Sequence, residues 1–233
     1  QQKAQLFGFN TFAEYQLEDK MAKTPQAAYD LLMTIWNAAL PKAKAEAAEL
    51  QKMMDAEGKG EKLEAWDWWY YTEKLREQKY ALSESELKPY FSLDNVRKGS
   101  FMVANKLFGV NFRPIEGVDI YHPEVKTFEV LDADSSHLAL FYADYFPRAT
   151  KRAGAWMSNF VEPFNVDGEN KRPMIVNVCN FTRPSGDTPS LLNIDETRTL
   201  FHEFGHALHG MLTQTRYPSV AGTSVARDFV ELP

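Results

Sequence analysis

The sequence has 233 residues, of which 44% are hydrophobic and 25% are charged, values close to the averages of globular proteins. This length is sufficient for one large folded domain or two smaller ones, and the composition excludes wholesale disorder. A net charge of −6 argues against a nucleic-acid partner, and no apolar run long enough to span a membrane is present in the sequence.

The first part of the chain has the sequence pattern of helices. Pro25, preceded by the capping residue Thr24, suits the first position of a helix, and apolar residues recur at helical spacing after it. Pro41 is expected to end or kink this helix. The alanine-rich stretch 42–57 then predicts a further helix, which Gly58 stops.

Two more helices are expected before residue 110. One begins near Glu61 and carries an aromatic cluster at 66–71, which is more typical of interdomain or core packing than of a ligand platform. The other follows Ser92 and ends at Gly109. Residues 1–110 are therefore predicted to form a helical region.

After residue 110 the pattern changes to that of strands. The stretches 127–131 and 137–141 flank a polar turn, which predicts a β-hairpin, and 174–181 alternates as a third strand. Residues 147–170 are expected to form a long loop, either functional or loosely ordered. Cys179, the single cysteine, excludes an internal disulfide, and its apolar neighbours favour a buried structural thiol over a nucleophile.

The segment His202-Glu203-Phe204-Gly205-His206 is the most informative part of the sequence. Two histidines four residues apart lie on the same face of a helix, within reach of one metal ion, and Glu203 beside the first is positioned to activate a water molecule. The stretch has the pattern of a helix, with Asp195 as its expected cap. The alternative is a buried amphipathic helix whose histidines make ordinary hydrogen bonds.

A catalytic zinc ion usually has three protein ligands, so a third one is needed. The extended motif with a third histidine is excluded, because Leu212 stands where that histidine would be. The other common arrangement takes a glutamate from a later segment, and Asp228 and Glu231 are the only acidic residues after His206. We predict that Glu231 is the third ligand and that Asp228 accepts a hydrogen bond from a ligand imidazole. A purely structural zinc site agrees poorly with three ligands beside a base.

The segment HEFGHALH, followed by GTSVARDFVELP with its glutamate 29 positions after the first histidine, resembles the thimet oligopeptidase and neurolysin family of zinc peptidases. The GTSVARDFVELP run is similar to the bacterial peptidyl-dipeptidase (dipeptidyl carboxypeptidase) branch of that family. Further similar stretches cover nearly the whole chain: Leu17–Ala22, Lys88–Phe91, Phe141–Asp144, Gly154–Met157 and Val176–Phe181.

This resemblance implies one zinc ion per chain, bound by the residues His202, His206 and Glu231, with Glu203 as the general base. It also implies oligopeptide substrates and the release of C-terminal dipeptides. An endo-acting oligopeptidase of the same family is one alternative, and a non-catalytic helical binding fragment is another. Members of the family are far longer, so we expect an internal fragment that lacks a C-terminal catalytic portion.

A sheet that precedes a zinc helix suggests how a peptide would bind. An exposed edge strand pairs with an extended peptide, and we consider the strand Met174–Phe181 and the segment Gly154–Met157 for this role. The alternative is that both segments only pack in the core.

The expected fold is mostly α with a small β-sheet, in the α+β class. Residues 1–110 are the helical region, and residues 111–233 contain the sheet, the zinc helix and the third-ligand segment. We expect a monomer without nucleic-acid or membrane partners, located in the cytoplasm, with the periplasm as the alternative.

Overall fold

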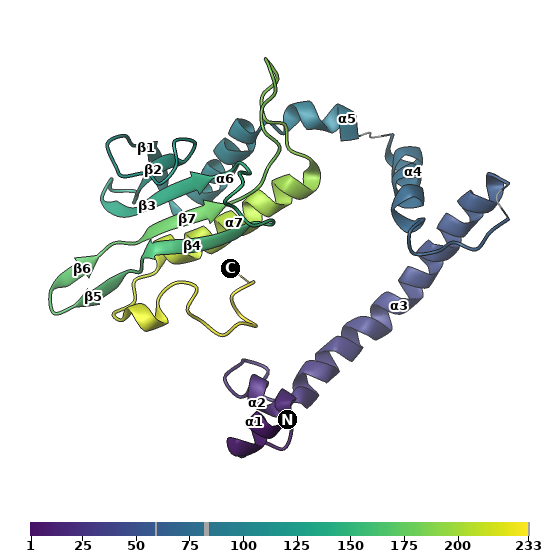
Figure 1. The fold of residues 1–233 in the computed structure, drawn as a ribbon, viewed down its shortest axis with the longest axis horizontal. Coiled ribbons are helices and arrows are strands. Elements are labelled where there is room, and N and C mark those ends of the chain that lie inside the picture. Colours follow the sequence, from purple (N-terminus) through teal and green to yellow (C-terminus); the bar gives the residue numbers. More distant parts are fainter. Residues whose placement is uncertain (59, 82–83, 233) are drawn as a thin grey trace. The chain divides into compact units, whose positions relative to one another are not determined.

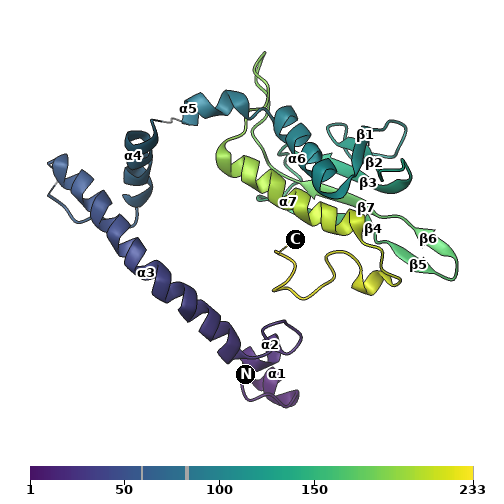
Figure 2. The same cartoon turned by 180° about the vertical axis from the view of Figure 1, so that it is seen from behind.

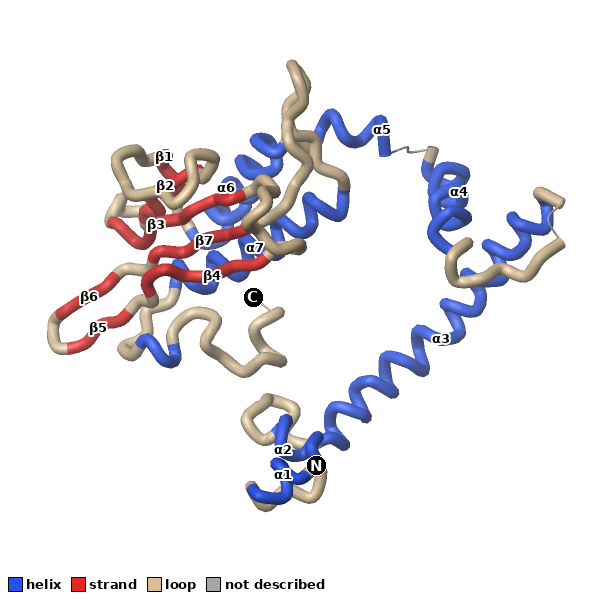
Figure 3. The backbone as a smooth tube through the Cα atoms, in the orientation of Figure 1, coloured by secondary structure: helices blue, strands red, loops and turns tan. Residues whose placement is uncertain are grey.

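The computed structural model describes residues 1–58, 60–81 and 84–232, and it divides into two compact units, Gln1–Glu86 and Leu87–Pro233 (Figure 1). Helices predominate in the first unit, and the second combines helices with a small sheet, as the colouring by secondary structure shows (Figure 3). The predicted α+β class is confirmed. Among the described residues, no helix combines the length and the apolar character that crossing a membrane requires.

The first unit consists of helices. They are α1 (Gln2–Leu6), α2 (Phe12–Leu17), α3 (Pro25–Ala56), α4 (Trp68–Tyr80) and the first part of α5 (Glu84–Leu87). The Thr24 side chain accepts a hydrogen bond from the Ala27 backbone, so the predicted cap before Pro25 is confirmed. Leu50, Met54 and Tyr71 form a small buried core where α3 and α4 pack together.

Two expectations for these helices are corrected. The helix does not end at Pro41, because α3 continues through it to Ala56, and a kink at Pro41 stays a prediction. A proline removes one backbone hydrogen bond. The alanine-rich sequence on both sides of Pro41 favours the helix enough for it to continue. The next helix, α4, begins at Trp68 and not near Glu61.

The second unit is built around a five-stranded sheet. Its strands, in the spatial order β1-β2-β3-β7-β4, are β1 (Asn111–Pro114), β2 (Lys126–Leu131), β3 (His137–Asp144), β7 (Met174–Val178) and β4 (Trp156–Val161). β3 and β7 are parallel and the other neighbours are antiparallel, so the predicted hairpin of β2 and β3 is confirmed. A separate small hairpin consists of β5 (Phe164–Val166) and β6 (Glu169–Lys171).

Two further expectations are corrected by this sheet. The stretch 147–170 is not a long loop, because it contains β4, β5 and the start of β6. The strand at Met174–Phe181 forms as β7, ending at Val178, but it lies between β3 and β4. Both of its edges are therefore occupied, and it cannot pair with a peptide. β4 is an edge strand, and one of its sides has no neighbouring strand among the described residues.

Two long helices cover one face of the sheet, α6 (Leu93–Phe108) and α7 (Ile194–Leu212). The view from behind shows them side by side in front of the strands (Figure 2). Ser92 caps the start of α6 and Gly109 ends it with a φ of 77°, as predicted. Between helices and sheet lies an aromatic cluster in which Phe101 stacks on Phe112 with ring centroids 4.1 Å apart. Short 3₁₀ helices at Lys88–Tyr90 and Pro218–Val220, and the end of α5, complete the unit.

The contacts assign α6 to the second unit, whereas the predicted division at residue 110 follows the change from helical to strand-like sequence. Leu93, Val96 and Ala104 of α6 are buried in the same core as the sheet. The division at residue 110 stays a prediction.

Candidate metal centre

The helix α7 carries the HEFGH segment and has a well-formed beginning. The Asn193 side chain accepts a hydrogen bond from the Glu196 backbone at 2.7 Å, and the Glu196 carboxylate accepts one from the Asn193 backbone at 3.0 Å. This reciprocal pair is a capping box, and it satisfies two backbone donors at the helix start. The expected cap, Asp195, instead lies in the first turn. An asparagine two residues earlier makes the cap because its partner Glu196 lies three residues after it.

The apolar face of α7 fixes the helix on the sheet. Leu200, Phe204, Ala207 and Met211 are buried in the main core. Gly210 allows a closer approach, since a Cβ atom there would lie 2.7 Å from Met157 Cε and 2.8 Å from Ile175 Cδ1. The packing turns the two histidines away from the core, and the side chains of His202 and His206 are 52% and 12% exposed.

Three potential ligand atoms meet beside this exposed face. The Nε2 atoms of His202 and His206 lie 3.2 Å apart, and Glu231 Oε2 lies 3.2 Å from the first and 3.4 Å from the second. Among the described residues, His202, His206 and Glu231 are the one group of three side chains able to hold a metal ion. They are the three residues predicted from the sequence.

These distances fit a zinc ion. Ligand atoms bound tetrahedrally at about 2.0–2.1 Å from zinc lie about 3.3–3.4 Å from one another. The donor set of two imidazoles and one carboxylate is also that of catalytic zinc sites. Without a proton or a cation between them, three lone-pair-bearing atoms at this separation repel one another, so the cluster suits a positive charge at its centre.

The segment after α7 brings Glu231 to the helix. Figure 1 shows this segment, in yellow, turning back from the end of α7. Gly222 lies in the left-handed region with a φ of 52°, and a Cβ atom there would lie 3.1 Å from the Gly210 Cα atom. The Gly222 backbone donates a hydrogen bond to Thr213 Oγ1 at 3.2 Å. Further along, Phe229 packs edge-on against the His209 ring, with centroids 6.4 Å apart. These contacts were not predicted from the sequence.

A cavity of about 420 Å³ opens beside the three ligand atoms. Its wall is formed by the ligands and Glu203 together with Ala155, Trp156, Met157, Thr223 and Val230. Ala155 to Met157 enter and begin the edge strand β4, so the cavity lies against the side of the sheet that has no neighbouring strand.

Glu203 borders this cavity and is 7% exposed. Burial raises the pKa of its carboxyl above the ordinary value, and the charge of Glu231 adds to that rise, whereas His202 and His206 oppose it. A carboxyl with raised proton affinity next to a metal site is typical of a general base that holds a proton temporarily.

The other titratable residues around the site have different positions. His209 is not among the ligand cluster, and burial lowers the pKa of its imidazole. His206 Nδ1 is buried without a hydrogen-bond partner among the described residues, and Asp228 stays a prediction as an acceptor. Cys179 is buried, and burial raises the pKa of its thiol to about 12, which agrees with a structural role.

A helix with two histidines and a buried glutamate between them, completed by a glutamate from a later segment, is typical of the two-histidine, one-glutamate class of metallopeptidases. The model of peptidase family M3 matches residues 1–233. The chain belongs to this family, so the resemblance seen in the sequence is confirmed.

Named relatives agree with this membership. The chain is 46% identical to dipeptidyl carboxypeptidase of Salmonella typhimurium over 99% of its length, and 44% identical to that of Escherichia coli over 100%. It is 40% identical to oligopeptidase A of Salmonella typhimurium over 99% of its length. In each comparison the chain spans 34% of the relative, about a third of its length.

Proposed function

We propose that this chain carries the metal centre of a zinc-dependent peptidase that hydrolyses short peptides. The observation that supports this most directly is the convergence of His202 Nε2, His206 Nε2 and Glu231 Oε2 at 3.2–3.4 Å from one another. Membership of peptidase family M3 supports the same reading.

In this proposal each residue has a separate task. The three ligands would hold a zinc ion, which when bound would supply the positive charge that polarises water and a peptide carbonyl. Glu203 accepts the proton of the attacking water and later donates it to the departing amine. Its position in the cavity wall beside both histidines and its raised pKa support this role.

The edge strand β4 offers a binding site for the substrate backbone. In the part of the chain that the structure describes, its outer side has no neighbouring strand, and Trp156 and Met157 at its start border the cavity. An extended peptide that adds to this edge would lie next to the ligand cluster. Of the two segments considered from the sequence, only Gly154–Met157 therefore remains for this role.

Release of C-terminal dipeptides is our preferred reaction, because the identities to the two dipeptidyl carboxypeptidases exceed that to oligopeptidase A. The alternative is endo-acting cleavage, since 40% identity to oligopeptidase A is also high. A non-catalytic fragment agrees less well with an intact Glu203, which is not needed merely to hold a metal ion.

The test is metal removal and restoration in the full-length enzyme. We expect a chelator to abolish hydrolysis of short peptides and stoichiometric zinc to restore it, with products identified by mass spectrometry. Dipeptides from the carboxyl end would support the preferred reaction, and internal fragments the alternative. Undiminished hydrolysis in metal-free enzyme, or none in zinc-loaded enzyme, would contradict the proposal.

Substitution of the proposed base separates catalysis from metal binding. We expect Glu203→Gln to retain zinc and lose at least about 100-fold in kcat, because a glutamine cannot take the proton. Zinc content by elemental analysis and peptide turnover are measured on the same preparation. Wild-type turnover in this variant would remove Glu203 from the base role.

A further inference from the structure

Arg152 is an exposed cation close to the proposed substrate strand. Its guanidinium carbon lies 4.5 Å from the centre of the Trp156 ring, a cation–π contact. Within the described part of the chain, no carboxylate pairs with this guanidinium. A guanidinium stacked by its face leaves its N–H groups free at the edge, where they suit bidentate binding of a carboxylate.

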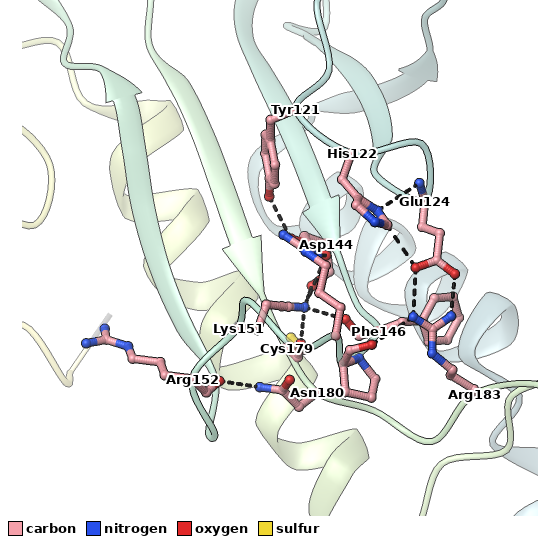
Figure 4. A network of polar contacts seen from close by, with 12 residues as sticks. Tyr121, His122, Glu124, Asp144, Phe146, Lys151, Arg152, Cys179, Asn180 and Arg183 are labelled. Carbon is pink, nitrogen blue, oxygen red and sulfur yellow. Dashed lines mark hydrogen bonds and ion pairs between the residues drawn. The ribbon is translucent and has the colours of Figure 1, made fainter.

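The backbone at Arg152 is held from two sides. The Asn180 side chain donates hydrogen bonds to the carbonyl oxygens of Arg152 at 3.0 Å and of Gly154 at 2.7 Å. The side chain of the preceding residue, Lys151, is 3% exposed. Its ammonium group donates hydrogen bonds to the Asp144 carboxylate at 3.1 Å, to the Phe146 carbonyl at 2.7 Å and to the Cys179 carbonyl. The loop that leads into β4 is therefore anchored to the ends of β3 and β7 (Figure 4).

The same network leaves Arg152 as the cation available to a ligand. The two other basic side chains of this loop, those of Arg148 and Lys151, both contact the buried Asp144 carboxylate. Figure 4 shows the Arg152 side chain turned away from Lys151 and Asp144, toward the side of the sheet where β4 lies. No carboxylate of the described residues compensates its charge there.

The direction of β4 determines which end of a peptide would reach Arg152. β4 runs from Trp156, beside the ligand cluster, to Val161, and Arg152 precedes it. Antiparallel pairing is the more stable arrangement, and it directs the carboxyl end of the peptide toward the start of β4. Two extended residues beyond the cleaved bond span only about 7 Å. The carboxylate of a terminal dipeptide would therefore lie near the start of β4.

We infer that Arg152 binds the C-terminal carboxylate of the substrate and so directs cleavage to the penultimate bond. This inference rests on the proposed peptidase function. An acidic side chain near the peptide end offers the same carboxylate chemistry, and the experiment separates the two sources.

The test uses the zinc-loaded full-length enzyme and three matched peptides: one with a free C-terminal acid, one amidated, and one amidated with glutamate as the last residue. We expect wild-type enzyme to prefer the free acid to the neutral amide by about 10- to 100-fold in kcat/KM, the range for a hydrogen bond to a charged group. Arg152→Gln should abolish this preference mainly through a raised KM, and leave cleavage of the neutral amide within about twofold. Arg152→Lys keeps the positive charge but lacks the planar guanidinium that binds a carboxylate through two hydrogen bonds. This variant should therefore show part of the preference that Arg152→Gln loses.

Lys171→Gln removes an exposed cation from β6 and is the matched control, expected to keep the full preference. Equal loss on both neutral and free-acid peptides in Arg152→Gln would overturn the inference, as would an unchanged preference. Faster cleavage of the amidated glutamate peptide than of the free-acid peptide would assign Arg152 to an acidic side chain instead. Zinc-loaded wild-type enzyme that cleaves peptides without regard to their C-terminus would refute this inference alone, whereas absence of all cleavage would refute the proposed function.

Discussion

Glu231 is the one proposed ligand that does not lie on α7, and its side chain is 65% exposed. An exposed carboxylate contributes little to folding, so its removal acts mainly on the metal ion. We expect Glu231→Ala to weaken zinc binding by at least about tenfold while leaving the thermal midpoint of the metal-free protein unchanged. Competition with a chelator of known affinity measures the first quantity and calorimetry the second.

Glu169→Ala, which removes another exposed glutamate on β6, is the matched control for the loss of a negative charge. Unchanged zinc affinity in Glu231→Ala would exclude it as the third ligand.

At the residue scale, the ligands were predictable because their geometry is encoded locally. The spacing of His202 and His206 places them on one helical face whatever the helix packs against. Glu231 followed by elimination, since few acidic residues come later. The contacts that bring Glu231 there were not predictable, because the approach of Gly222 to Gly210 joins positions from separate segments through the path of the chain between them.

At the element scale, Gly222 joins the Glu231 segment to α7. We expect Gly222→Ala to destabilise the fold by about 1–3 kcal/mol beyond backbone strain, because its methyl group would lie 3.1 Å from the Gly210 Cα atom and would force the helix backbone or the segment to shift. Zinc affinity should fall as well, since the segment that carries Glu231 is displaced. Urea unfolding and chelator competition measure the two effects.

Gly168→Ala provides the control for strain alone. Gly168 also has a positive φ, of 85°, but a Cβ atom there would meet nothing within 4 Å. Equal destabilisation by the two substitutions would show that the close contact between Gly222 and Gly210 contributes nothing.

The buried Asp144 links β3 to the loop that leads into β4. Burial alone raises the pKa of its carboxyl, but the contacts with Arg148, Tyr121 and Lys151 outweigh this and hold that pKa below its ordinary range. Asp144→Asn leaves the two cations without their partner, and we expect a loss of about 3 kcal/mol in the free energy of unfolding at pH 7. Asp187→Asn, at an exposed position, is the control.

The pH dependence follows from the same pKa. Because the folded-state pKa of Asp144 is depressed, its contribution is complete well above the unfolded-state value of about 3.9 and is lost as the pH falls below that value. The difference in unfolding free energy between wild type and Asp144→Asn should therefore narrow below about pH 4. A difference that stays constant between pH 7 and pH 3 would contradict this account.

The elements that were predicted correctly carry strong local signals, and those that were missed depend on tertiary structure. Ser92 and Gly109 bound α6 through a cap and a left-handed residue, both readable from sequence. The edge strand β4 was missed because basic and glycine-rich residues just before it suggested a loop, although the alternation from Trp156 to Val161 was a usable signal. The extended conformation of β4 depends on its pairing with β7, and this pairing could not be predicted from the local sequence.

At the scale of the whole molecule, the position of the domain boundary decides which part of the chain can bind zinc. All three proposed ligands, the sheet and both covering helices lie within Leu87–Pro233. The sequence-based boundary at residue 110 would remove α6 from this unit. That loss exposes the core that Leu93, Val96 and Ala104 share with α7 and the sheet, and it separates Phe101 from Phe112.

The two boundaries therefore make opposite predictions for two truncated proteins. We expect a protein beginning at residue 87 to bind zinc within about threefold of the affinity of the 233-residue chain, because its core and ligands are complete. A protein beginning at residue 111 should lose cooperative unfolding and high-affinity zinc binding, since truncating several large core residues costs about 2–5 kcal/mol each, in total more than the stability of a typical domain. Zinc titration with thermal unfolding compares the two.

The residue-87 protein carrying Glu231→Ala distinguishes the proposed site from adventitious binding, because it keeps every element of the core. Equal zinc affinity and cooperativity in the two truncated proteins would establish residue 110 as the boundary and would show that α6 is not needed to hold α7 against the sheet. Loss of both properties in the residue-87 protein would show instead that the metal centre depends on residues 1–86.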